Sequence, residues 1–161
     1  MTTQTLTHEQ LIEHIKGVRK IVINDCYGGF GLSHEAIIHY LELSGQEVWP
    51  EEDSKFSRLV GPTYWLIPPD GPRVVAQPEN WHVMTLTERA AHNATYKQQV
   101  FSPREIVRDD PYLVQVVEEL QSNADGSHSK LKVVTIPADV QWQIEEYDGA
   151  EWVAEQHRIW R

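Results

Sequence analysis

The sequence predicts an α+β fold, a single domain in which a mostly antiparallel sheet packs against two or three helices and ends in a C-terminal β-hairpin. Three observations predict it. A β-branched run at residues 20–23 leads through a glycine-rich loop into a capped helix that ends near residue 45. Asp110 and Pro111 supply the N-cap and the first residue of another helix. Asp148-Gly149 joins two alternating segments, which is typical of a two-residue hairpin.

The length and the charge limit the classes of protein to consider. The 161 residues suit one domain, residues 1–161, with a loop-rich insertion at about 46–103. Asp and Glu number 24 against 14 Lys and Arg, so the formal net charge is -10. That charge argues against a broad surface for the nucleic-acid backbone or for an anionic membrane. No apolar run is long enough to span a bilayer and the N-terminus is polar, so we expect a cytoplasmic protein.

Cysteine and histidine usage argues against a metal site. Cys26 is the only cysteine, so the chain has no internal disulfide and no Cys-x-x-Cys motif. The histidines show neither an i, i+4 pair nor a His-Glu-x-x-His motif. We therefore expect no metal and no cofactor.

The N-terminal third predicts helix, strand and helix. Thr7 and Gln10 form a capping box for a first helix, which should end near residues 17–19. The run at residues 20–23 predicts a strand buried on both faces. Ser33 is a good N-cap for the helix that follows the glycine loop.

The middle of the chain is less regular. Residues 63–67 predict a strand, and residues 73–75 a partner strand that returns after a proline-rich turn at 68–72. Thr85 is a good cap for a helix that ends at Gln99.

The last third has stronger patterns. Residues 111–120 predict a helix and residues 130–136 a strand. Residues 140–147 and 151–160 predict the two strands of the hairpin, and a short helix capped by Asp148 is the alternative for the second of them.

The glycine loop at residues 24–33 is the sharpest candidate site. It leads into a helix N-terminus, where backbone N–H groups and the helix dipole attract phosphate or carboxylate. Tyr27 and Phe30 are placed to stack on a base. The alternative is that the glycines only form a tight turn with Phe30 buried, and the pattern fits neither a P-loop nor a dinucleotide motif. The candidate ligand-binding residues of the loop are Asn24, Tyr27, Gly28, Gly29, Phe30, Gly31 and Ser33.

Arg104 and Arg108 form the second candidate feature. Their spacing places both guanidinium groups on one side of a helix or of an extended strand, where they could grip a diphosphate. The alternative is that they pair with the neighbouring Glu105, Asp109 and Asp110.

The pattern gives little support to catalysis. Cys26 and His34 lie near the glycine loop and could form a nucleophilic pair, but nothing in the sequence completes a triad. We therefore expect a binding protein with no catalytic residues, and a Cys–His hydrolase is the enzymatic alternative.

Three motifs stand out together: VINDCYGGFGLS at residues 22–33, RDDPYLVQVVEEL at 108–120 and IEEYDG at 144–149. They resemble the signature of a family of small tailed-phage proteins, and the similarity covers roughly residues 19–45 and 104–161. This resemblance implies a phage origin. The chain is also similar to phage proteins that disarm Thoeris immunity by sequestering its cyclic ADP-ribose-type signal. That similarity implies a homo-oligomeric binder that uses arginines and aromatic residues at a subunit interface.

The leading hypothesis from sequence is therefore a phage anti-defence protein in the host cytoplasm that binds a nucleotide signal without cleaving it. The alternative is an acidic inhibitor that mimics DNA and blocks a host nuclease or CRISPR effector, because the excess of carboxylates is what such a protein needs. Neither hypothesis involves direct binding to nucleic acid or to a membrane.

Overall fold

The computed structural model describes residues 17–52 and 61–156, so the helix predicted after Thr7 lies outside the described residues. It confirms the α+β class, with helices and antiparallel strands and a C-terminal hairpin. The strands form three small sheets, where the sequence indicated one central sheet. The chain divides into two compact units, residues 41–105 and the remainder, and the first of these largely coincides with the predicted insertion.

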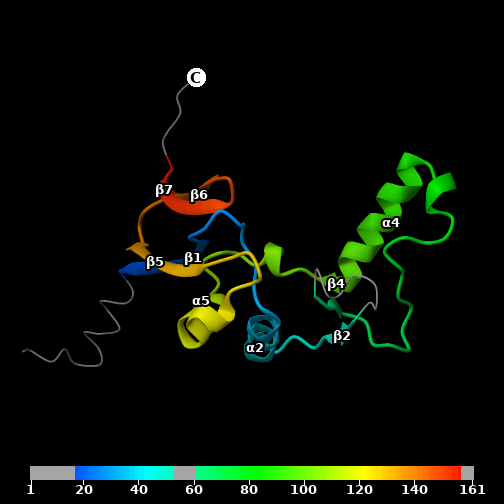
Figure 1. The fold of residues 1–161 in the computed structure, drawn as a ribbon, viewed down its shortest axis with the longest axis horizontal. Coiled ribbons are helices and arrows are strands. Elements are labelled where there is room, and N and C mark those ends of the chain that lie inside the picture. Colours follow the sequence, from blue (N-terminus) through cyan, green and yellow to red (C-terminus); the bar gives the residue numbers. More distant parts are fainter. Residues whose placement is uncertain (1–16, 53–60, 157–161) are drawn as a thin grey trace, which may run out of the picture. The chain divides into compact units, whose positions relative to one another are not determined.

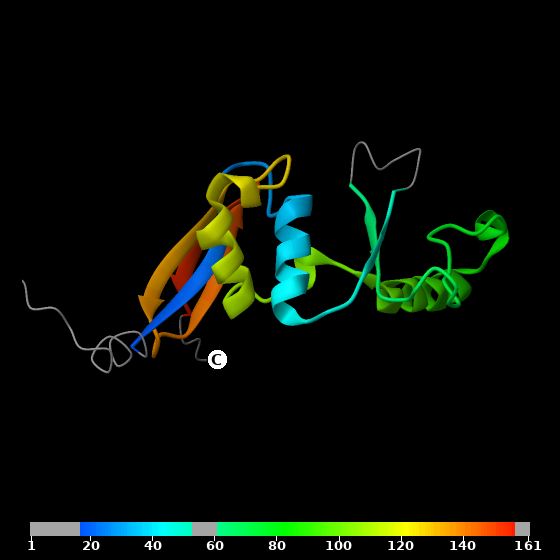
Figure 2. The same ribbon diagram turned by 90° about the horizontal axis from the view of Figure 1, so that it is seen from below.

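The larger unit is built on the antiparallel pair β1 (Val18–Asn24) and β5 (Leu131–Pro137). The helix α5 (Pro111–Leu120) packs against this pair, and β6 (Trp142–Tyr147) and β7 (Ala150–Glu155) form the hairpin. Figure 1 shows the β1–β5 pair between α5 on one side and the hairpin on the other, and in Figure 2 α5 lies in front of the strands.

This layering explains the apolar run of β1. Ile21, Val22 and Ile23 are 0%, 0% and 4% exposed, because successive side chains of a strand point to opposite faces and β1 packs against both α5 and the hairpin strand β7. The prediction of a strand buried on both faces is therefore confirmed. The helix α5 turns one apolar face to the same core, and its buried residues recur at helical spacing: Leu113, Val114, Val116 and Val117.

Local signals set the ends of the helices. Ser33 Oγ accepts a hydrogen bond from the Ala36 N–H at 3.1 Å at the start of α2 (His34–Ser44). Asp110 caps α5 by accepting from the N–H groups of Tyr112 and Leu113, at 2.9 and 3.0 Å. Short 3₁₀ helices lie at Trp81–Val83, Pro103–Glu105 and Gln121–Ala124.

The C-terminal segment forms the predicted hairpin and not the short helix that was the alternative. Asp148 and Gly149 have φ of 50° and 86°, the two positive values that a two-residue turn of the primed type requires. The turn brings Tyr147 opposite Ala150.

The smaller unit holds a three-stranded antiparallel sheet in the order β2 (Trp49–Glu51), β3 (Thr63–Trp65) and β4 (Val100–Phe101). Its helix α4 (Leu86–Gln99) starts at a complete capping box between Thr85 and Glu88. None of the helices among the described residues is both long enough and apolar enough to cross a membrane.

The predicted partner strand at residues 73–75 is wrong. Both edges of β3 are taken by strands distant in sequence, since Trp65 lies opposite Trp49 on one side and Val100 on the other. The 73–75 segment instead bonds to a side chain, because the Val74 N–H donates to Gln99 Oε1 at 2.8 Å.

Candidate functional site

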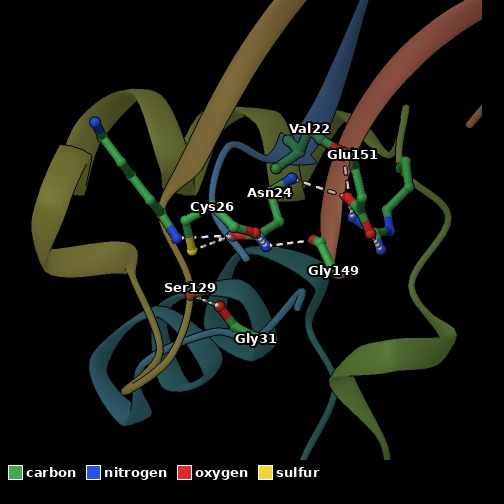
Figure 3. Close-up of polar contacts among 9 residues, drawn as sticks. Val22, Asn24, Cys26, Gly31, Ser129, Gly149 and Glu151 are labelled. Atoms are coloured by element: carbon green, nitrogen blue, oxygen red, sulfur yellow. Dashed lines mark hydrogen bonds and ion pairs between the residues drawn. The ribbon is translucent and has the colours of Figure 1, made fainter. Parts of the chain in front are cut away.

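The glycine loop lies between β1 and α2, and Asn24, the last residue of β1, makes hydrogen bonds to the segments around it (Figure 3). The Asn24 side chain is fully buried. Its amide nitrogen donates to the carbonyls of Cys26 and Gly149, both at 2.7 Å. Its Oδ1 accepts from the Lys130 N–H at 2.8 Å and from Cys26 Sγ at 3.3 Å. Both donors and both acceptor positions of the amide are used, so Asn24 ties together three segments of the chain.

Arg108 is held in a bidentate ion pair with Glu151. Nη1 lies 3.0 Å from Oε2 and Nη2 lies 2.8 Å from Oε1. The two side chains are 17% and 9% exposed. Glu151 Oε2 also accepts from the Asn24 N–H at 2.8 Å, and the Arg108 carbonyl accepts from the Val22 N–H at 2.8 Å. The two residues therefore accept hydrogen bonds from the backbone N–H groups of β1 on the edge that does not pair with β5.

The glycines let backbone segments approach closely. A Cβ on Gly28 would lie 1.7 Å from the His128 carbonyl oxygen, and one on Gly149 would lie 2.6 Å from the Gly29 nitrogen. Gly29 also has φ of 88°, which favours glycine. Gly31 is close to Gly126, whose N–H donates to the Gly31 carbonyl at 3.1 Å. These contacts give the loop a packing role and favour the alternative of a structural turn.

The two aromatic residues of the loop have different surroundings. The Arg108 guanidinium lies over the Phe30 ring, with its carbon 3.4 Å from the ring centroid, so one face of Phe30 is occupied. Tyr27 is 73% exposed. Of the two rings predicted to stack on a base, Tyr27 is the one open to solvent.

The two predicted arginines belong to different units. Arg104 is exposed and lies in the smaller unit, whereas Arg108 lies in the larger one. Arg108 pairs with Glu151, and among the described residues none of the three carboxylates considered from sequence, Glu105, Asp109 or Asp110, forms an ion pair with it.

Other predicted site residues stabilise the loop. Ser33 caps α2, and its hydroxyl donates to the Asn123 carbonyl at 2.6 Å. The Cys26 thiol donates to Asn24 Oδ1 and lies 3.5 Å from the His128 carbonyl oxygen. These contacts use the thiol without the His34 ring that a nucleophilic pair needs. Within the described ranges, no group of three or more His, Cys, Asp or Glu residues could hold a metal ion.

In the larger unit several lysine and arginine side chains form ion pairs, whereas the exposed carboxylates of the hairpin do not pair with any described lysine or arginine. Arg19 pairs with Asp109 and Lys20 with Glu118. Lys132 pairs with Asp25 at 3.7 Å. In the part of the chain that the structure describes, no Lys or Arg pairs with the exposed carboxylates of the hairpin, which are Glu145, Glu146, Asp148 and Glu155.

Glu151, which bonds both Arg108 and the backbone of Asn24, is a site residue that was not predicted from the sequence. Side chains two residues apart in a strand lie on the same face, so Glu151 shares a face of β7 with the partly buried Val153. This spacing predicts that the Glu151 carboxylate faces inward. A carboxylate on an inward face needs a cation partner, because burying an unpaired charge is costly.

No protein-family model matches the chain, and neither the curated proteins nor the solved structures gave a match.

Proposed function

We propose that the chain is a binding protein that inhibits a partner through an acidic surface, in the manner of a DNA mimic. The observation that carries the proposal is the pairing of Arg108. The guanidinium that would hold a phosphate is already neutralised by Glu151 and covered on one side by Phe30. Binding a phosphate there would require breaking a largely buried ion pair and leaving Glu151 without a partner.

The unpaired charges support the same proposal. The larger unit uses Arg19, Lys20 and Lys132 in internal ion pairs, while the hairpin keeps exposed carboxylates that no described cation neutralises. Such a surface attracts a basic protein and repels anionic ligands. A nuclease or another DNA-binding effector in the host cytoplasm is the class of partner it fits, because those proteins carry basic grooves for the phosphate backbone.

Titration calorimetry of the full chain with a nona-arginine peptide tests the proposal. We expect saturable binding with a defined stoichiometry and an affinity that falls steeply between 50 and 200 mM salt, about the range over which phosphate contacts weaken. A DNA duplex should compete with the chain for the peptide. Absence of saturable binding at low salt would contradict the proposal.

Sequestration of a nucleotide signal by a phage anti-defence protein is the second candidate. The exposure of Tyr27, beside the backbone of Gly28 and Gly29, favours it, because an open ring can stack on a base. Arg104 is also exposed. Protein purified from cells that make the cyclic ADP-ribose-type signal should then release that nucleotide unchanged on heating, and Tyr27→Ala should abolish retention. Calorimetry that detects no binding of any such nucleotide would remove this candidate.

A further inference from the structure

The β6–β7 hairpin has two different faces. Its register places Glu151 and Val153 on the face whose members contact Arg108 and the end of β1. The opposite face carries Glu145, Tyr147 and Trp152, because Glu145 is paired with Trp152 and Tyr147 lies two residues from Glu145. A hydrogen bond confirms that Glu145 and Trp152 share this face, since Glu145 accepts from Trp152 Nε1 at 3.2 Å. Glu145 also accepts from Gln143 Nε2 at 3.1 Å, two residues earlier on the same strand.

This outer face exposes large aromatic side chains. Tyr147 is 72% exposed and Trp152 is 44% exposed. They are diagonal neighbours on the two strands, a separation that long aromatic side chains can bridge. Tyr27, in the glycine loop whose backbone lies close to Gly149 of the hairpin turn, is another exposed ring of the larger unit. Exposed aromatic residues that gather in one place mark interaction surfaces, where they act as anchors.

The charge of the face defines what it can bind. Two neutral donors orient the Glu145 carboxylate, and no cation among the described residues neutralises it. Each carboxylate oxygen keeps further acceptor capacity for an incoming donor. A guanidinium or ammonium group between this carboxylate and the two rings would gain a charged hydrogen bond and cation–π contacts together. The exposed carboxylate of Asp148, in the turn next to Tyr147, adds to the attraction.

We propose that the outer face of the hairpin, formed by Glu145, Tyr147 and Trp152, docks a basic segment of a partner protein by holding one arginine or lysine side chain between the rings and the carboxylate. This inference rests on the proposed function and names the surface that performs it. Arginine is favoured over lysine, because its planar group both stacks on an aromatic ring and bonds a carboxylate.

Three substitutions in the full chain test the surface, with nona-arginine as the probe. Trp152→Ala, Tyr147→Ser and Glu145→Gln should each weaken binding, and Trp152→Ala together with Tyr147→Ser should weaken it by about tenfold. Trp152→Phe should retain most of the affinity, since it keeps a ring. In ¹H–¹⁵N spectra, the indole N–H of Trp152 should shift when the peptide is added.

Two matched controls separate this surface from general charge and general aromatic exposure. Glu35→Gln removes an exposed carboxylate of α2, outside the hairpin, and Tyr112→Ser removes an exposed tyrosine of α5. Both should bind the peptide within about twofold of the unsubstituted chain. Circular dichroism should show that every variant keeps the fold, because the side chains removed are exposed.

The outcomes separate the two proposals. If the unsubstituted chain binds nona-arginine and the outer-face variants bind it equally well, the docking surface is wrong while the acidic binding function stands. If the unsubstituted chain does not bind, the proposed function itself is wrong. Sedimentation that shows a dimer dissociated by Trp152→Ala would also overturn the docking proposal, since the face would then be occupied by a second copy of the chain.

Discussion

The ion pair between Arg108 and Glu151 makes a quantitative prediction about stability. Glu151→Gln removes the negative charge and leaves the Arg108 guanidinium, 17% exposed, without its partner. Breaking a fully buried pair costs roughly 3–5 kcal/mol, and the partial exposure of Arg108 lowers our expectation to about 2–4 kcal/mol. The exposed pair of Lys20 and Glu118 supplies a control, because Lys20→Met should cost less than about 1 kcal/mol.

Urea unfolding followed by circular dichroism measures both changes. The midpoint should fall for Glu151→Gln with little change in the slope, which would locate the effect in the folded state. A cycle with Arg108→Met and the double variant should show a coupling of about 1–3 kcal/mol. The reasoning fails if Glu151→Gln costs no more than Lys20→Met, or if the coupling is near zero.

Single contacts support three further predictions. Gly28→Ala should prevent or strongly impair folding, because its Cβ would meet the His128 carbonyl oxygen, whereas Gly31→Ala, whose Cβ meets nothing within 4 Å, should leave the thermal midpoint almost unchanged. The hydrogen bond from His39 lowers the pKa of Glu119. This carboxylate therefore stabilises the fold above the pKa of about 4.5 that it has when unfolded, and the contribution is lost as the pH falls through its lower folded value. Unfolding midpoints between pH 6 and 3 should consequently fall less for Glu119→Gln than for the unsubstituted chain. Thr85→Ala should destabilise α4 by about 1 kcal/mol and raise hydrogen exchange in its first turn, since it removes the capping box, and unchanged exchange there would contradict this.

The parts of the fold that the sequence predicted are those set by neighbours in the chain. Ser33 and Asp110 each cap the helix that follows directly, and Asp148-Gly149 closes a hairpin between adjacent strands. The strand at residues 73–75 was predicted wrongly because the partners of β3 come from distant segments. A local pattern indicates that a segment is extended, but it does not say which strand will lie beside it.

The candidate site shows the same limit. The need for glycine in the loop could be read from residues 28–31, but its cause at Gly28, the approach of His128, depends on a segment far along the chain. Arg108 was matched with carboxylates next to it in sequence, and its partner Glu151 lies 43 residues away. Tertiary packing decides which carboxylate reaches a given guanidinium, and this information is not local.

Parallel calorimetric titrations of the full chain with nona-arginine and with an ADP-ribose-type nucleotide test the central claim most directly. If the acidic surface is the binding surface, the peptide will bind saturably and with strong salt dependence. If the Arg108 guanidinium stays in its ion pair with Glu151, the nucleotide will give no binding heat. Tight binding of the nucleotide that is lost in Arg108→Ala would contradict the account, because Arg108 would then serve a ligand instead of Glu151.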